Sequence, residues 1–541
     1  MRSRMRFLSS PLICQIDRGS IGFHRFGDII LFFIYFFCDR NGFNHNIRLE
    51  DTMTKKKSPK SLYKLCMEET FSYLVQKIWN GGETNPFSQI NCNIVNDLFK
   101  FIVFGMKNGT PRPLKLLLKS GQLQDLILDG LDFTEEQWRS VMKYLLEEGD
   151  SCRNITYISV NDSFQNAEQG SLERLIEKCP LLEILHTMTY FNLSALKNCL
   201  RLKNVTSYYS GLKEYRYFWN ESVDTLANLQ NLKKFDIFQC RNSSSYYKHI
   251  AKMLQNHPKL VSLGDTDSSW AAHHIYTTCR MDIVPRFGLK KCFWGFNKNV
   301  EEFYRQQTAY IQQFPVFVKS SVVLFPLVEK LLIIVYHEDC IQHLKKLKHL
   351  RVLEIDFSLC CGLPARTAFI SLLSEIGPQL KGLSILDHKP MPVDVIMKYC
   401  SNVVQMDLRC KAIVQGGIET DSHHFRQLEK LLLNEMDAES LEYLLRNSLK
   451  LKELLLVDAL CVDDTLLHKI LKKNYLSQLN TIAVYECRLS REGLKELVQK
   501  CANLEIAAFE TLDADMMIVA KELERDIRAA YFYVEQDLTA Y

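Results

Sequence analysis

A leucine-spaced pattern recurs along most of the chain and limits the folds that it can adopt. Its clearest copy is residues 479–505, "LNTIAVYECRLSREGLKELVQKCANLE". There Leu479, Ile482 and Val484 follow L-x-x-L-x-L, whose period of two predicts a strand. From Gly493 onward the apolar residues are spaced as on one face of a helix. A strand–helix unit of this size cannot cover its own apolar face, so successive units must stack on one another.

Comparable segments occur along the chain at spacings mostly from the twenties to about 30 residues, which is the range of leucine-rich repeats. They begin at Leu123, Ile155, Leu182, Leu202, Leu232, Leu260, Val328, Leu350, Leu380, Val403, Leu428 and Leu451. The stretch 264–327 is irregular, and we interpret "LKKCFWGF", from Leu289, as a degenerate strand within it. Trp270 and Trp294 are expected to fill the core there.

The cysteines follow the same rhythm. The chain has 18 cysteines and no C-x-x-C pair, so the spacings typical of zinc ribbons and thioredoxin-like proteins are absent. Five of them precede the first apolar position of a strand by three residues: Cys152, Cys179, Cys199, Cys400 and Cys501. A recurring phase predicts reduced thiols that pack as small apolar groups in a reducing compartment.

This pattern resembles the cysteine-containing class of leucine-rich repeats over roughly residues 120–510. The resemblance implies an α/β solenoid, curved, with parallel strands on the concave side and helices outside. With 541 residues the chain is too long for one compact layered domain and suits a repeat array.

Composition and motifs argue against several classes of function. The net charge of +4 is small for this length and does not predict nucleic-acid binding. The sequence contains no glycine-rich phosphate loop and no H-E-x-x-H or G-x-S-x-G motif. We therefore predict a non-catalytic protein without cofactor or metal, located in the cytoplasm or nucleus. Several polar residues are interpreted as loop polarity: His273, His274, His423, His424 and the segment "HEDC" at 337–340.

The amino-terminal region stands outside the repeat. Residues 1–52 include "IILFFIYFFC" (29–38), which is too short to span a membrane. We interpret this region as a disordered or spurious extension, with Met53 as a more natural beginning. A membrane-surface anchor is the alternative. The predicted organisation is an extension at 1–52, a helical adaptor-binding box at 53–110, the repeat array at 111–511 and a capping helix at 512–541. That last helix is predicted over residues 513–536.

A helix is predicted over residues 60–79, after Ser58-Pro59, which suits an N-cap and first turn. It carries two apolar stripes, about 100° apart. The first consists of Tyr63, Met67, Phe71, Leu74 and Ile78, and the second of Leu62, Cys66 and Tyr73. One stripe is enough to dock a helix on its own domain, so the second requires another partner.

The segment "SLYKLCMEET" (61–70) resembles a BC box, the elongin-C-binding helix of the von Hippel–Lindau and Zyg-type substrate receptors. Its pattern is a small residue, leucine, three others, a cysteine or small residue, three others and an aliphatic residue. Ser61, Leu62 and Cys66 match, and Thr70 replaces the aliphatic residue. The resemblance implies binding of elongin C, and with it elongin B, through these four residues.

A second segment, "INCNIVNDL" (90–98), resembles the cullin box that follows in such receptors. Ile90, Ile94 and Leu98 match its hydrophobic positions, and Asn91 stands where proline is usual but is a good N-cap. The resemblance implies a cullin-2-type cullin as partner of these residues. We expect the residues at 90, 94, 98 and 102 to form one continuous apolar stripe.

Two other interpretations of this region remain open. The helices could simply cover the first repeat, with Leu62 and Cys66 as ordinary core, in a leucine-rich scaffold without any ligase link. The region could also be an F-box, which binds Skp1, although its Leu-Pro opening and its later Val-Cys-x-x-Trp-like element are lacking.

A protein substrate of unknown identity is expected on the concave side of the array. In L-x-x-L-x-L the alternate residues point to that face. In the carboxy-terminal half they include polar residues and then a mostly apolar strip. We predict that the substrate contacts Leu432, Asn434, Glu453, Leu455, Val457 and Tyr485. The alternative is that the carboxy-terminal helix or a neighbouring loop covers this strip. The hypothesis is a substrate-recognition subunit of an elongin–cullin ubiquitin ligase, without binding to nucleic acid or membrane.

Overall fold

The computed structural model describes much of the chain from residue 62 to residue 529. The described residues are 62–75, 85–105, 111–129, 131, 133–146, 151–161, 164, 170–189, 191–208, 228–238, 246–264, 268–279, 286–295, 300–360, 363–387, 389–414, 425–509, 513–525 and 527–529. All of them belong to one unit, residues 48–531.

Seventeen strands are found within these residues, and they form one sheet. They are β1 (Asp125–Ile127), β2 (Tyr157–Val160), β3 (Ile184–Thr187), β4 (Asn204–Tyr208), β5 (Lys234–Phe238), β6 (Ser262–Leu263), β7 (Lys291–Trp294), β8 (Lys330–Ile334), β9 (Val352–Asp356), β10 (Gly382–Leu386), β11 (Met391–Pro392), β12 (Gln405–Ile413), β13 (Lys430–Met436), β14 (Glu453–Val457), β15 (Thr481–Val484), β16 (Ile506–Phe509) and β17 (Arg528–Ala529). Each pairs in parallel with its neighbours along the chain, except that β10 pairs with β12 and β11 adds to the end of β12.

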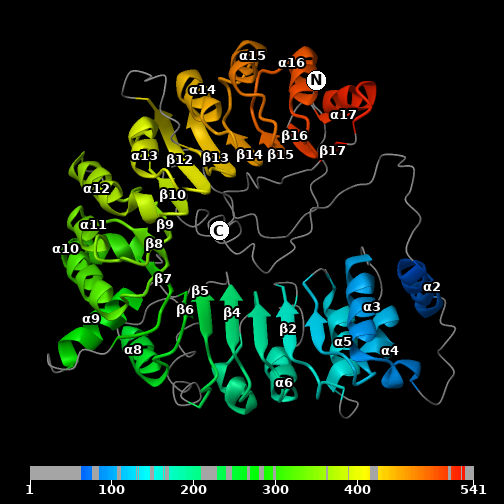
Figure 1. The fold of residues 1–541 in the computed structure, drawn as a ribbon. Coiled ribbons are helices and arrows are strands. Elements are labelled where there is room, and N and C mark those ends of the chain that lie inside the picture. The colour runs from blue at the N-terminus through cyan, green and yellow to red at the C-terminus, as the bar shows by residue number, and fades with distance from the viewer. Residues whose placement is uncertain are drawn as a thin grey trace. The chain divides into compact units, whose positions relative to one another are not determined.

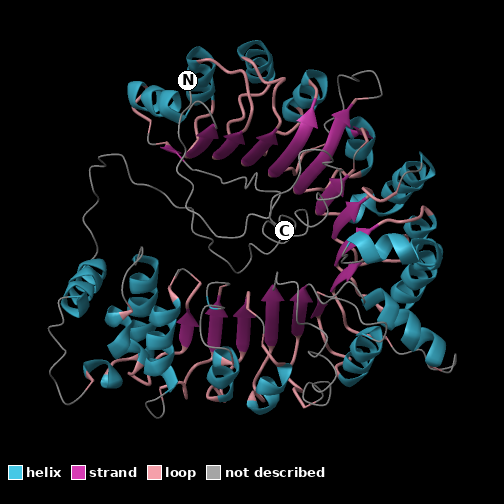
Figure 2. Ribbon diagram, turned by 180° about the vertical axis from the view of Figure 1, so that it is seen from behind, coloured by secondary structure: helices cyan, strands magenta, loops and turns pink. Residues whose placement is uncertain are grey.

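Helices follow most of the strands and lie on one face of the sheet (Figures 1 and 2). They are α2 (Leu62–Val75), α3 (Cys92–Gly105), α4 (Lys115–Leu118), α5 (Glu135–Leu146), α6 (Ser171–Glu177), α8 (Tyr246–Asn256), α9 (Ser268–Thr278), α10 (Val300–Leu324), α11 (Asp339–Leu344), α12 (Leu363–Ile376), α13 (Val393–Tyr399), α14 (Ala438–Arg446), α15 (Asp464–Lys473), α16 (Arg491–Lys500) and α17 (Asp513–Glu522). Short 3₁₀ turns are η1 (Pro86–Gln89), η2 (Arg112–Leu114), η4 (Leu193–Asn198) and η6 (Gly377–Gln379). The fold is therefore an α/β leucine-rich repeat solenoid, as the sequence predicts.

The repeat between β15 and α16 shows how the sequence produces each unit. Leu479, Ile482 and Val484 point into the core and are fully or almost fully buried. Ser490 then begins α16, because its side chain accepts hydrogen bonds from the backbone N–H groups of Glu492 and Gly493. Asp437 and Asp463 cap α14 and α15 in the same way. Alternating apolar residues and polar caps thus fix where each strand ends and each helix begins.

The cysteines that recur before the strands lie in the core. Cys179, Cys199, Cys400 and Cys501 are 0% exposed and Cys152 is 2% exposed, which confirms the prediction that these side chains pack as small apolar groups. Among the described residues no group of three or more His, Cys, Asp or Glu side chains is arranged to hold a metal ion.

The irregular stretch contains a strand and an unusually long helix. β7 lies within the segment that we interpret as a degenerate strand, and Trp294 at its end is fully buried. Trp270 is half-buried and packs against Phe317 of α10, with ring centroids 5.2 Å apart. α10 has 25 residues and includes Pro315. The repeat therefore continues through this stretch with a longer helical layer.

The prediction of one helix over residues 513–536 is wrong beyond Glu522. Glu524 has a φ of +53°, a left-handed conformation that ends an α-helix. The Arg525 guanidinium then donates hydrogen bonds to the backbone carbonyls of Cys501 and Ala502. The chain returns to the sheet, where β17 pairs with β16. Residues 530–541 lie outside the described part of the chain.

Candidate functional site

The helix that carries the BC-box pattern, α2, packs on its own chain through the apolar stripe that contains Met67 and Leu74. Met67 and Leu74 are each 7% exposed, and the Phe71 ring contacts Phe101 of α3 edge-on, with centroids 6.3 Å apart. α2 packs on α3 and on η2. The first of the two predicted stripes therefore docks α2 on the chain itself, within the part of that stripe that is described.

A different side of α2 carries an exposed leucine. Leu65 is 46% exposed, and its position is about 160° around the helix from Met67. Ser61 and the side chains of Leu62 and Cys66 lie outside the described part of the structure. By helical position, Leu62 lies about 140° and Cys66 about 100° around α2 from Met67. Thr70 is half-buried.

The helix that carries the cullin-box pattern, α3, begins as predicted but presents a different face. Asn91 caps it, because its Oδ1 accepts a hydrogen bond from the backbone N–H of Asn93 at 2.9 Å. The buried face consists of Val95, Leu98, Phe99, Ile102 and Val103. Ile94 is 46% exposed, so the expected stripe through positions 90, 94, 98 and 102 is wrong as a continuous surface. A strict spacing of four residues drifts by about 40° per step on an α-helix.

The four predicted cullin contacts are consequently divided between two environments. Leu98 lies in the core of its own chain at 2% exposure, and Ile90 is half-buried. Asn91 and Ile94 are exposed at the start of α3. A partner of this helix would therefore contact its first turn.

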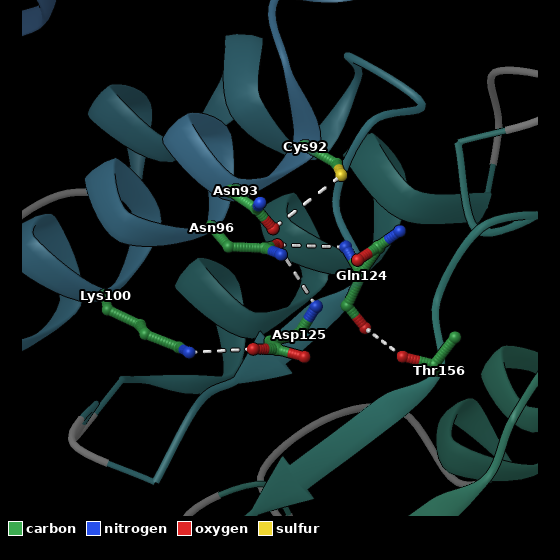
Figure 3. Close-up of polar contacts among 7 residues, drawn as sticks. All are labelled: Cys92, Asn93, Asn96, Lys100, Gln124, Asp125 and Thr156. Atoms are coloured by element: carbon green, nitrogen blue, oxygen red, sulfur yellow. Dashed lines mark hydrogen bonds and ion pairs between the residues drawn. The ribbon is translucent and has the colours of Figure 1, made fainter.

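Polar contacts fasten α3 to the first strand of the sheet (Figure 3). The Asn96 Oδ1 atom accepts hydrogen bonds from the backbone N–H groups of Gln124, at 2.9 Å, and Asp125, at 3.2 Å. One turn later, Lys100 forms an ion pair with Asp125 at 2.7 Å. A strand at the edge of a sheet otherwise presents unpaired backbone groups. α3 therefore covers the beginning of the array at β1, and sequence reasoning missed this role of Asn96.

The sheet face opposite the helices is partly exposed over β13 and β14. On these strands buried residues alternate with half-buried ones, whereas β8 and β9 are buried on both faces beyond their first residue. Register places Leu432 beside Leu455, and Leu455 beside Ala483. The first two are half-buried, and Ala483 is buried. The predicted apolar strip is therefore contiguous across neighbouring strands.

Polar residues border this strip on both sides. Lys430 and Glu453 form an ion pair across β13 and β14 at 2.8 Å. Asn434 lies beside Val457, and the buried Oδ1 atom of Asn434 has no hydrogen-bond partner among the described residues. Tyr485 follows β15 and is half-buried. Five of the six predicted substrate contacts thus lie on the neighbouring strands β13 and β14, and the sixth, Tyr485, lies in the turn after β15.

Three acidic residues beside the strip have unusual backbone conformations. Glu435, Asp458 and Glu486 have φ values of +54°, +50° and +56°. Each lies seven residues after the first leucine of its repeat, so they occupy the same place at the ends of neighbouring strands. Positive φ is uncommon for residues other than glycine and often marks functional or strained positions. Their recurrence at one phase was the signal in the sequence that could have revealed them.

Elsewhere the same face carries acidic residues that are already paired. Asp236, which is 2% exposed, lies 3.3 Å from the Lys234 ammonium and accepts a hydrogen bond from Ser262. Burial raises the pKa of the Asp236 carboxyl, and the nearby lysine opposes that shift. Lys330 and Glu354 form a second pair at 3.0 Å. The Ser262–Asp236 and Lys330–Glu354 contacts join neighbouring strands, and the Lys234–Asp236 pair lies within β5.

Comparisons with known proteins yield one structural similarity. The sequence matches no family model and no curated protein. Among solved structures, the complex of Rad7 and Elc1 from yeast is similar, with a TM-score of 0.35 and 14% identity. The match covers 86% of this chain and 91% of that chain. Within the described residues, the helices are too short or too polar to cross a membrane.

Proposed function

We propose that this protein is the substrate-recognition subunit of an elongin BC–cullin-2-type ubiquitin ligase. In this role α2 binds elongin C, the start of α3 contacts the cullin, and the repeats hold a protein substrate. The chain itself performs no catalysis and acts in the cytoplasm or nucleus.

The observation that carries this proposal is the placement of α2. The stripe that contains Met67 and Leu74 attaches the helix to its own chain. Leu65 is exposed on another side of α2, and Leu62 and Cys66 of the BC-box pattern lie between these two sides by helical position. A helix that has an apolar side left over after docking can enter the groove of a partner. Leu62 would be the anchor, and burying a leucine contributes about 1.5–3 kcal/mol.

The cullin contact is proposed from the first turn of α3. Asn91 and Ile94 are exposed there, while Leu98 and Phe99 hold the rest of the helix on the array. An exposed isoleucine beside an elongin-binding helix gives the second partner an apolar contact at a fixed position.

The test is co-purification of the full chain with elongins B and C. Leu62→Asp places a carboxylate at the anchor and is expected to weaken elongin C binding about a hundredfold or more. Thr70→Ile restores the aliphatic residue of the pattern and is expected to strengthen binding several-fold. Ile94→Asp is the matched control, because it changes an exposed isoleucine outside α2 and should reduce only cullin capture.

Each other result assigns the protein differently. Failure of the unmutated chain to bind elongin C removes the ligase proposal. Capture of Skp1 instead assigns the region to the F-box class. Capture of neither adaptor leaves a leucine-rich binding scaffold.

A second prediction concerns the strip on β13 and β14. Leu455→Glu is expected to abolish substrate capture while leaving the unfolding temperature within a few degrees, because the Leu455 side chain is only half-buried. Leu454→Glu is the matched contrast, since Leu454 is 3% exposed on the opposite face and a buried carboxylate should unfold the repeat. Thermal unfolding and capture from cross-linked extracts measure the two effects. Collapse of the fold in Leu455→Glu would show that the strip belongs to the core.

A further inference from the structure

The edge of the sheet at which the strands begin is held together by a ladder of backbone hydrogen bonds. Just before each strand, one N–H group donates to the corresponding carbonyl of the preceding repeat. The ladder runs from Lys203 through residues 233, 261, 290, 329, 351 and 381, with N···O distances between 2.6 and 2.8 Å. The side chains at these positions therefore recur at the spacing of adjacent strands, about 4.8 Å.

Between β5 and β10 this edge is strongly basic. We name as the basic rim its six exposed cationic residues: Lys233, Lys259, Lys290, Lys291, Arg351 and Lys381. They lie at or just before the starts of five of the six neighbouring strands β5–β10. The exception is β8, where Glu329 occupies the ladder position.

Most of this charge is not balanced within the described residues. Lys290 pairs with Glu329 at 2.7 Å, and Lys291 interacts electrostatically with Asp236. Lys233, Lys259 and Lys381 form no ion pair among the described residues, and the Arg351 guanidinium donates to the carbonyl of Gln379 rather than to a carboxylate. The half-buried lysines of this edge are already paired, as in Lys203 with Glu183 at 2.6 Å, and the exposed Lys450 before β14 donates to the Gln427 side chain. The basic rim therefore has charge left for a partner.

The repeat architecture by itself does not require this charge. Helix carboxyl termini, which favour nearby cations, precede the later strands as well. There the ladder positions are occupied by Glu429, Lys452, Asn480 and Glu505, which carry no excess of positive charge. The positive charge is confined to one block of repeats and calls for an explanation specific to that block.

We propose that the basic rim binds an acidic polypeptide segment in extended conformation. Five steps between neighbouring strands span about 24 Å, which about seven residues of extended chain can cover. Carboxylates on alternate residues of such a segment, about 7 Å apart, would lie within reach of the long lysine side chains along the rim. The binding is electrostatic and rapid, and it weakens with salt.

Three observations favour a polypeptide over a nucleic acid. None of the ladder positions before β5–β10, residues 233, 261, 290, 329, 351 and 381, carries an aromatic side chain on which bases could stack. Glu329 interrupts the row, and the net charge of +4 is low for a nucleic-acid-binding protein.

This surface lies apart from α2 and from the strip on β13 and β14. The proposal goes beyond the role in a ubiquitin ligase and does not depend on it, because the basic rim can be tested without elongin or cullin.

The test is fluorescence anisotropy of the full chain with a labelled glutamate-rich peptide of about ten residues, at low salt. The triple variant Lys233→Glu/Arg351→Glu/Lys381→Glu is expected to weaken binding about tenfold or more. The control Lys115→Glu/Lys472→Glu/Lys495→Glu removes the same charge from helices α4, α15 and α16 and should leave affinity within about twofold. Circular dichroism on heating checks that both variants are folded.

Two results would overturn the proposal. One is equal binding of the peptide by the rim variant and the unmutated chain, or no binding by either. The other is preference for an oligothymidylate of equal charge, lost in the rim variant, which would assign the surface to nucleic acid.

Discussion

Replacing Asn96 by leucine is expected to lower the free energy of unfolding by about 2–4 kcal/mol and to loosen the attachment of α3. The substitution keeps a side chain of similar size but removes the acceptor for two backbone N–H groups, those of Gln124 and Asp125. Each buried donor that loses its partner costs about 1–3 kcal/mol. Urea unfolding measures the change, and hydrogen exchange at β1 should rise because this strand begins the array.

Asn96→Asp provides the control, since a carboxylate at the same position can accept both hydrogen bonds. It should retain most of the stability and the protection of β1. If Asn96→Leu unfolds at the same urea concentration as the unmutated chain, α3 is not the element that covers this end of the sheet. The comparison also matters for the ligase proposal, because α2 packs on α3.

The second large effect concerns the buried thiols. Burial raises the pKa of the Cys199, Cys400 and Cys501 thiols to about 12, from an ordinary value of 9.0. At pH 8 the reactive thiolate should therefore be about a thousandfold scarcer than in the unfolded chain. We expect iodoacetamide to alkylate these three cysteines at least that much more slowly in the native protein than in urea, as followed by peptide mass spectrometry.

The pH dependence follows with a definite sign. The folded chain keeps these thiols protonated up to about pH 12, whereas the unfolded chain releases the protons near pH 9.0. The thiols therefore do not change stability with pH below about 9, and they reduce it as the pH rises above that value. The half-buried Cys92 is the internal control for reagent activity. Alkylation of Cys400 within tenfold of its rate in urea would contradict this account.

The fold was predictable because one signal repeats many times. L-x-x-L-x-L fixes which residues face the core in each strand, and errors in one repeat do not move the others. The weak strand at β7 was found because its neighbours set the phase. The carboxy-terminal helix was extended too far because Glu524 and Arg525 end it through backbone conformation and hydrogen bonds that no apolar pattern records.

The candidate sites were less predictable, because they depend on contacts between segments that are distant in the sequence. Ile94 fits the cullin-box spacing, yet it is Val95 and Phe99 that share the buried face with Leu98, because α3 turns its most continuous apolar side to the repeats. The strip of Leu432 and Leu455 followed directly from strand alternation. Asn96 was missed because its role depends on strand β1, about thirty residues away.

The ladder that joins Lys203 to Lys381 has a consequence for how such a protein can diverge. Consecutive repeats meet through backbone atoms at this edge, so the spacing there is independent of side-chain identity. The connections that follow the other ends of the strands differ greatly in length. The connection between β4 and β5, for example, is longer than the one between β12 and β13. Insertions can accumulate in these connections over evolutionary time, while the edge at which the strands begin keeps a constant spacing between repeats. Charged side chains at that edge can therefore be replaced one at a time without changing the spacing.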